Sequence, residues 1–93
     1  MVERKVRVVN EKGLHMRVAG SFCEQALKFK SVIEIHLDSD KILNAKSMLS
    51  ILSGGIVKGQ EITIRCKGVD EEEALETICG YIAKGFGEKK ENS

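Results

Sequence analysis

The chain has 93 residues and contains no tryptophan, no proline, one tyrosine and three phenylalanines. Proteins that bind single-stranded nucleic acid stack the bases on aromatic side chains set among basic residues, and this sequence has no such run. The formal net charge is only +1, which provides no broad attraction to nucleic acid or to an anionic membrane surface. We therefore expect neither nucleic acid nor a membrane as a partner.

Long apolar segments are absent as well. Every apolar run is far shorter than the roughly 20 residues that cross a bilayer as a helix. The charged residues Glu3, Arg4 and Lys5 are not followed by an apolar signal segment, which favours a cytoplasmic protein. A chain of this length forms one domain, which we place at residues 1–87. Residues 88–93 have no apolar side chain and predict a flexible charged tail.

The three cysteines, Cys23, Cys66 and Cys79, are widely spaced and form no Cys-x-x-Cys pair. A zinc site or a redox-active dithiol is therefore not expected, and we interpret each cysteine as a small apolar side chain on a buried face. The glycine-containing segment 54–59 lacks the Lys-Ser or Lys-Thr ending of a nucleotide-binding P-loop. We accordingly predict no metal and no cofactor.

Three segments alternate between apolar and polar residues, which is typical of strands that bury one face. These segments are residues 5–9, 33–37 and 61–67, with apolar positions at Val6, Val8, Ile33, Ile35, Leu37, Ile62, Ile64 and Cys66. A short run at 41–43 can pair with the second strand through the turn-forming residues 38–40. On the second strand, we expect His36 to point outward without a function.

Two further segments, 18–29 and 70–82, have the apolar spacing of amphipathic helices. Asp70 is expected to cap the second of them, with Glu73 completing a capping box. A short helix follows Lys46 and ends at the glycines at 54–55. The order β-α-β-β-α-β-α with one-faced strands predicts an α+β fold whose helices cover one side of an antiparallel or mixed sheet, and several split-βαβ folds satisfy this description.

The segment Gly13-Leu14-His15-Met16-Arg17 lies between the first strand and the first helix. A helix N-terminus attracts anions through its unpaired N–H groups and its dipole. The Arg17 guanidinium matches phosphate oxygens, and a neutral His15 imidazole is nucleophilic near pH 7. The segment therefore predicts a histidine that accepts a phosphoryl group and passes it on, with Arg17 as its clamp. A capping or core histidine is the alternative.

The same segment, extended to Val18 and Ala19, resembles the Gly-Leu-His-Ala-Arg-Pro-Ala active-site sequence of the histidine-containing phosphocarrier protein (HPr) family of the bacterial phosphotransferase system. A second stretch of that family appears at residues 44–49 as Asn-Ala-Lys-Ser-Met-Leu. The departures are Met16 for alanine, Val18 for proline and Gly54 for leucine. Because valine does not fix φ as proline does, we expect a less pre-organised helix start and slower or partner-shifted transfer.

The resemblance implies an open-faced β-sandwich: a four-stranded antiparallel sheet in the order 1-4-2-3 with three helices on one face. It also implies a monomeric carrier that is phosphorylated on His15 at Nδ1. Such a protein is an intermediate in phosphoryl transfer and not a stand-alone catalyst. The implied donor is enzyme I, a phosphoenolpyruvate-dependent protein kinase, and the implied acceptors are sugar-specific enzyme IIA components.

Ser47 begins the short helix, and from the sequence alone an N-cap is the simplest interpretation. In the resembled family this serine is a regulatory phosphorylation site of an HPr kinase, which implies a link to a transcriptional regulator. The resemblance further implies that Met48, Leu49 and Leu52 contribute to an apolar patch that binds partners.

Two other functions remain open. The protein could be an HPr-like regulator that keeps the fold and controls a transcription factor or an enzyme instead of sugar transport. It could also be an unrelated split-βαβ ligand-binding module, although that hypothesis explains neither of the two motifs.

Overall fold

The computed structural model describes residues 1–87, so the predicted tail at 88–93 lies outside the described residues. The elements are β1 (Val2–Arg7), α1 (Met16–Ala26), β2 (Val32–His36), β3 (Ile42–Asn44), α2 (Met48–Ser53), β4 (Glu61–Lys67) and α3 (Glu71–Ala83). The element order predicted from the sequence is confirmed.

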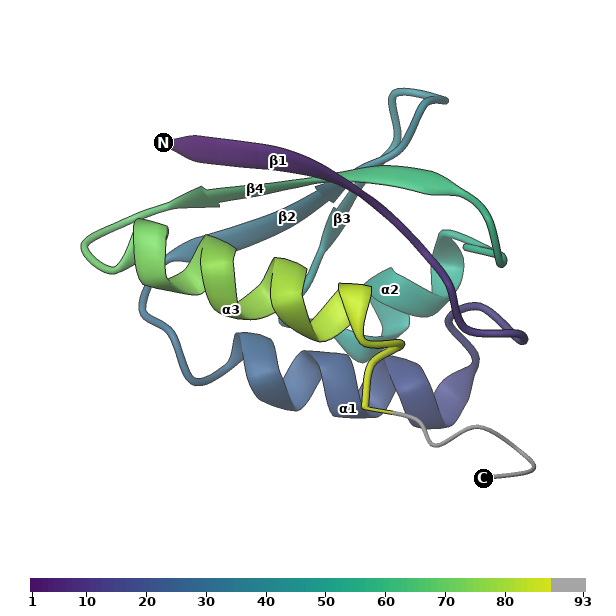
Figure 1. The fold of residues 1–93 in the computed structure, drawn as a ribbon. Coiled ribbons are helices and arrows are strands. Elements are labelled where there is room, and N and C mark those ends of the chain that lie inside the picture. The colour runs from purple at the N-terminus through teal and green to yellow at the C-terminus, as the bar shows by residue number, and fades with distance from the viewer. Residues whose placement is uncertain (88–93) are drawn as a thin grey trace.

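All strand pairs are antiparallel, and the sheet has the order β1-β4-β2-β3. The three helices form a layer on one face of this sheet, and the other face is uncovered (Figure 1). The register places Ile35 of β2 beside Ile64 of β4 and Leu43 of β3. The strands therefore share one apolar face, and the predicted open-faced sandwich is confirmed.

The core lies between this apolar face and the helices. Its fully buried large side chains are Val8, Val18, Phe22, Ile33, Ile35, Leu43, Ile51, Ile62, Ile64, Cys66, Ile78 and Ile82. Burial of one such aliphatic or aromatic side chain contributes about 1.5–3 kcal/mol. Beyond α3, Phe86 turns back into the core and packs edge-on against Phe22, with the ring centroids 5.5 Å apart. The helical pattern did not predict this last contact.

The first two elements have other bounds than predicted. β1 begins earlier than residue 5 and ends at Arg7, because Val8 leaves the ladder and hydrogen-bonds instead to Gly59 and Gln60 of the loop before β4. Helix α1 begins at Met16, and after Ala26 the chain tightens into turns in which the amide of Phe29 donates to the carbonyl of Ala26.

The prediction that the Asp70 side chain caps α3 is wrong. Asp70 occupies the N-cap position of α3, but its carboxylate makes no cap hydrogen bond there. It accepts instead from the amides of Lys30 and Ser31 and from the hydroxyl of Ser31. These bonds join the start of α3 to the α1–β2 connection, and the predicted capping box with Glu73 is not what holds this helix end.

Gly54, which stands where the resembled family has leucine, ends α2 beside the core. A Cβ atom at this position would lie 2.5 Å from Cδ1 of Leu43. The buried Leu43 side chain therefore occupies the space that a larger residue 54 would need.

Candidate functional site

The turn before His15 is held against the loop that precedes β4. Gly13 has φ +62°, a left-handed conformation that glycine adopts without strain. The next residue, Leu14, is buried, and its amide donates to the carbonyl oxygen of Ile56 at 3.1 Å. Lys58 and Glu11 form an ion pair of 2.6 Å across the same two loops. The strand-to-helix junction is thus anchored to a distant part of the chain.

His15 is the N-cap residue of α1, with extended backbone angles, and its carbonyl accepts the helical hydrogen bond of Ala19 at 2.8 Å. The amides of residues 16–18 precede that first helical bond, and α1 has no acidic residue in its first turn. The half-buried imidazole therefore stands at a helix end whose dipole attracts negative charge, with no carboxylate in that turn to neutralise it.

Arg17 lies in the first turn of α1 and is exposed to solvent. An exposed guanidinium near an N-terminal amide cluster can reach an anion that arrives from solution. The structure therefore places the two predicted chemical residues, His15 and Arg17, at the same end of one helix. Val18, where the resembled family has proline, is buried in the core, and the helix starts before it.

Ser47 is the N-cap of α2, and its hydroxyl accepts from the amide of Ser50 at 3.2 Å, which confirms the capping interpretation. Helix α2 lies against α1, as the contact between Gly20 and Met48 shows. A Cβ atom on Gly20 would be 3.7 Å from Sδ and Cε of Met48. Gly20 is five residues beyond His15, which corresponds to about 7.5 Å along the helix axis. The structure thus brings the start of α2 to the same side of the molecule as His15.

The predicted apolar patch is exposed unevenly. Leu49 is 82% exposed, whereas Met48 and Leu52 are half-buried and pack against the core, to which fully buried Ile51 belongs. Met16, treated in the sequence only as a departure from the family pattern, is 67% exposed beside His15. Among the three predicted patch residues, Leu49 therefore offers the largest accessible apolar surface.

Two residues that support the site escaped sequence reasoning. Ile56 supplies the carbonyl that fixes Leu14, and no local pattern could reveal a contact so distant along the chain. Asn10 is buried and donates from Nδ2 to the carbonyl oxygen of Gly13 at 2.5 Å. An asparagine followed by a glycine three residues later is a turn signal that could have indicated this bond.

The cysteines have the character expected from the sequence. Cys66 and Cys79 are buried and Cys23 is half-buried, and all are free thiols. Burial raises the pKa of the Cys66 thiol to about 11 and also raises that of Cys79, so both stay protonated and unreactive near neutral pH. Within residues 1–87 no cluster of His, Cys, Asp or Glu is large enough to hold a metal ion. None of the helices in that range has the length and apolar character that crossing a bilayer requires.

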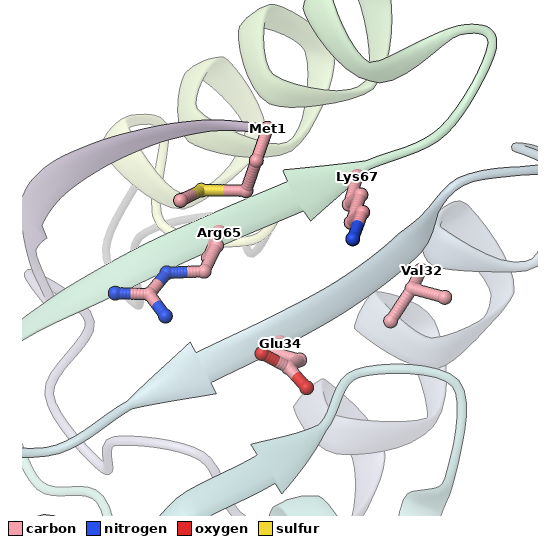
Figure 2. Close-up of a pocket in the computed structure, with 5 residues that line it drawn as sticks. All are labelled: Met1, Val32, Glu34, Arg65 and Lys67. Carbon is pink, nitrogen blue, oxygen red and sulfur yellow. The ribbon is translucent and has the colours of Figure 1, made fainter.

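A shallow hollow lies on the uncovered face of the sheet, away from the helices (Figure 2). Met1, Val32, Glu34, Arg65 and Lys67 line it. Predicted to be an outward residue, His36 contacts Glu34 through Nε2, 2.9 Å from Oε1, and Arg65 forms an ion pair with Glu3. The hollow contains none of the predicted site residues.

Comparison with known proteins agrees with this geometry. A family model for the phosphorylation site of the HPr component of the phosphotransferase system matches residues 2–84. The phosphocarrier protein HPr of Buchnera aphidicola is 38% identical over 78 residues, which cover 84% of this chain and 91% of the relative. The structure is similar to HPr from Thermoanaerobacter tengcongensis, with a TM-score of 0.90, 38% identity and coverage of 97% and 100% of the two chains.

The chain is also similar to Crh, a protein that is named differently from the HPr relatives above. The crystal structure of Crh, the catabolite repression protein of Bacillus subtilis, superposes with a TM-score of 0.73 at 37% identity and covers 90% of this chain and 95% of that one. That protein is described as a dimer with a swapped domain.

Proposed function

The chain belongs to the HPr family of the phosphotransferase system, and we propose that it is a phosphocarrier that accepts a phosphoryl group on His15 and passes it to another protein. The observation that carries the proposal is the place of His15 at the N-terminus of α1, with Arg17 in the first turn and no acidic residue there. A helix end of this kind favours the phosphoryl oxygens both in the bound state and during transfer.

Within this chain, the proposed transfer uses His15, Arg17 and the amides at the start of α1. A neutral imidazole nitrogen of His15 attacks the phosphorus, the new N–P bond forms, and the bond to the donor breaks with its electron pair on the donor. In the second step the acceptor attacks the same phosphorus and the electron pair of the N–P bond returns to the ring. Arg17 and the amides of residues 16–18 face the phosphoryl oxygens in both steps. The reacting nitrogen is Nδ1 by family resemblance.

We propose enzyme I as donor and sugar-specific enzyme IIA components as acceptors, with the protein acting as a cytoplasmic monomer. The protein is a covalent intermediate in this scheme and not a stand-alone catalyst. Incubation with enzyme I and phosphoenolpyruvate should add one acid-labile phosphoryl group, seen by intact mass. His15→Ala should gain no phosphoryl group, while His36→Ala should gain one, as the protein without substitutions does. Equal labelling of His15→Ala would remove His15 as the acceptor.

A regulatory role is the second candidate, favoured by the similarity to Crh. Ser47 caps α2 on the side of the molecule that carries His15, so a phosphate on Ser47 would place negative charge where partners of His15 dock. The modifying enzyme would be an HPr kinase, and the protein that binds the phosphorylated form would be a transcriptional regulator. Incubation with such a kinase and ATP should phosphorylate the native protein and leave Ser47→Ala unmodified. Equal modification of Ser47→Ala would reject this site.

A further inference from the structure

Asn10 and Ser31 are the two buried polar residues of the part of the chain that the structure describes. Ser31 has a structural explanation, because it bonds to Asp70 at the end of the molecule where α3 begins. Asn10 lies at the other end of α1, in the turn that leads to His15. A buried polar side chain needs hydrogen bonds to offset its desolvation, so its partners indicate what it stabilises.

Asn10 closes the turn before His15 from both of its ends. Its Nδ2 donates to the carbonyl oxygen of Gly13 at 2.5 Å, and its own carbonyl accepts from the amide of Gly13 at 3.1 Å. The segment after α3 covers this turn, since a Cβ atom on Gly85 would lie 3.9 Å from Cβ of Asn10 and from Cγ2 of Val9. Because Asn10 is only 8% exposed, water has little access to replace its side chain.

This turn determines where His15 stands. Gly13 leads directly into Leu14, whose amide is bonded to Ile56 and whose side chain is buried, and His15 follows as the N-cap. A proline ring could restrain the first turn of α1 from within, but residue 18 is valine. The position of the imidazole relative to the helix amides therefore depends on the chain before it.

We propose that Asn10 is a positioning residue for His15: through the carbonyl of Gly13 it fixes the turn that holds the imidazole against the N-terminus of α1. This inference rests on the proposed carrier function. Phosphoryl transfer is sensitive to small displacements of the nucleophile, so loss of the Asn10 bond lowers the rate of transfer more than it weakens docking of the donor.

The test compares Asn10→Ala with Ser31→Ala, which removes the other buried polar side chain at the far end of the fold. Both variants should lose thermal stability. Asn10→Ala should lower the rate of His15 phosphorylation at saturating enzyme I by about 10- to 100-fold, with a less than about twofold change in the half-saturating concentration. Ser31→Ala should keep both parameters. Asn10→Asp has the same shape but presents no donor when ionised, and should be slow as well.

The outcomes separate the two proposals. If the protein without substitutions is not labelled, the carrier function fails. If it is labelled and either folded Asn10 variant keeps the full saturated rate, the positioning role alone fails. Amide hydrogen exchange on the protein without substitutions is an independent check that needs no variant. The amides of Gly13 and Leu14 should exchange as slowly as the hydrogen-bonded amides of α1, and rapid exchange at both under native conditions would overturn the positioning role.

Discussion

Gly13 and Ile56 lie so close together that a Cβ atom at position 13 would come within 2.3 Å of the carbonyl oxygen of Ile56. The same carbonyl oxygen accepts the amide of Leu14, the residue immediately before His15. The glycine of the site is therefore required for two reasons, its left-handed φ of +62° and the absence of a side chain. Any larger residue at position 13 therefore pushes the two loops apart next to His15.

Gly13→Ala should accordingly destabilise the fold and slow phosphorylation of His15. The left-handed backbone alone costs a residue with a side chain about 1–2 kcal/mol, and the collision with Ile56 adds to that cost. Gly55→Ala is the matched control, because Gly55 also has a positive φ, of +59°, but a Cβ atom there meets nothing within 4 Å. Urea denaturation should show a larger loss for Gly13→Ala, and equal losses would show that the contact with Ile56 is not limiting.

Arg17→Ala should fold normally and transfer phosphoryl groups more slowly. Removal of one preorganised donor from a developing anion costs roughly 2–4 kcal/mol in a dry site. Arg17 is exposed, so screening by water reduces that effect, and we expect a loss of about 10- to 100-fold in rate. Arg17→Lys should recover part of it, since lysine keeps the charge but lacks the fork of donors. A full rate for Arg17→Ala would mean that the backbone amides of α1 suffice.

Substitutions on α2 should affect docking of the donor and leave the chemistry intact. Leu49→Asp should raise the half-saturating concentration of enzyme I without a loss of stability, because Leu49 is 82% exposed. Val69→Asp is the control, since Val69 is 86% exposed in the β4–α3 connection, away from His15. Met48→Asp should also weaken docking, but with a loss of stability because Met48 packs on the core. If Leu49→Asp and Val69→Asp behave alike, Leu49 is not part of the docking surface.

Ser47→Asp should keep the fold, since a carboxylate can cap a helix, and should raise the same half-saturating concentration by adding a negative charge. Ser47→Ala should transfer normally and lose about 1 kcal/mol of stability with its cap. These values follow from phosphorylation rates measured against donor concentration and from urea denaturation. An unchanged rate and half-saturating concentration for Ser47→Asp would leave Ser47 as a helix cap only.

Asp70 should make the stability of the protein sensitive to acid. The hydroxyl of Ser31 and the amide of Lys30 hold the pKa of the Asp70 carboxyl below its usual value, so this contact stabilises the fold at neutral pH. The unfolded carboxyl has a pKa of about 3.9, and the stabilisation is lost progressively as pH falls below that value. Asp70→Ala should be less stable at pH 7 and show a shallower loss on acidification, measured by urea denaturation at successive pH values.

The acid response should not vanish in Asp70→Ala. The pKa values of Glu71 and Glu11 are also lowered, by the N-terminal amine and by Lys58 respectively, so both titrate in the same direction. If the unmodified protein and Asp70→Ala lose stability in parallel between pH 5 and pH 2, the bond to Ser31 does not depend on the charge of Asp70.

The sequence by itself determined the order of the elements, their buried faces and the place of His15 at the start of α1. Alternating residues such as Ile33 and Ile35 predict one-faced strands because side chains alternate across a sheet, and the structure buries those faces. The strand-to-helix junction that holds His15 was equally local, since a glycine, a histidine and an arginine at a helix start are adjacent in the chain. The strand order was not local, and it came from resemblance to a family.

Only the tertiary structure decided what holds the site in place. The bond from Leu14 to Ile56, the cover that Gly85 provides over Asn10 and the contact of Gly20 with Met48 all join segments that are distant in sequence. Asp70 illustrates the same limit, because its local context predicted a helix cap and its carboxylate instead bonds to Ser31 across the fold. Local patterns record the periodicity of an element, whereas the partner of a buried polar group is set by how the elements pack.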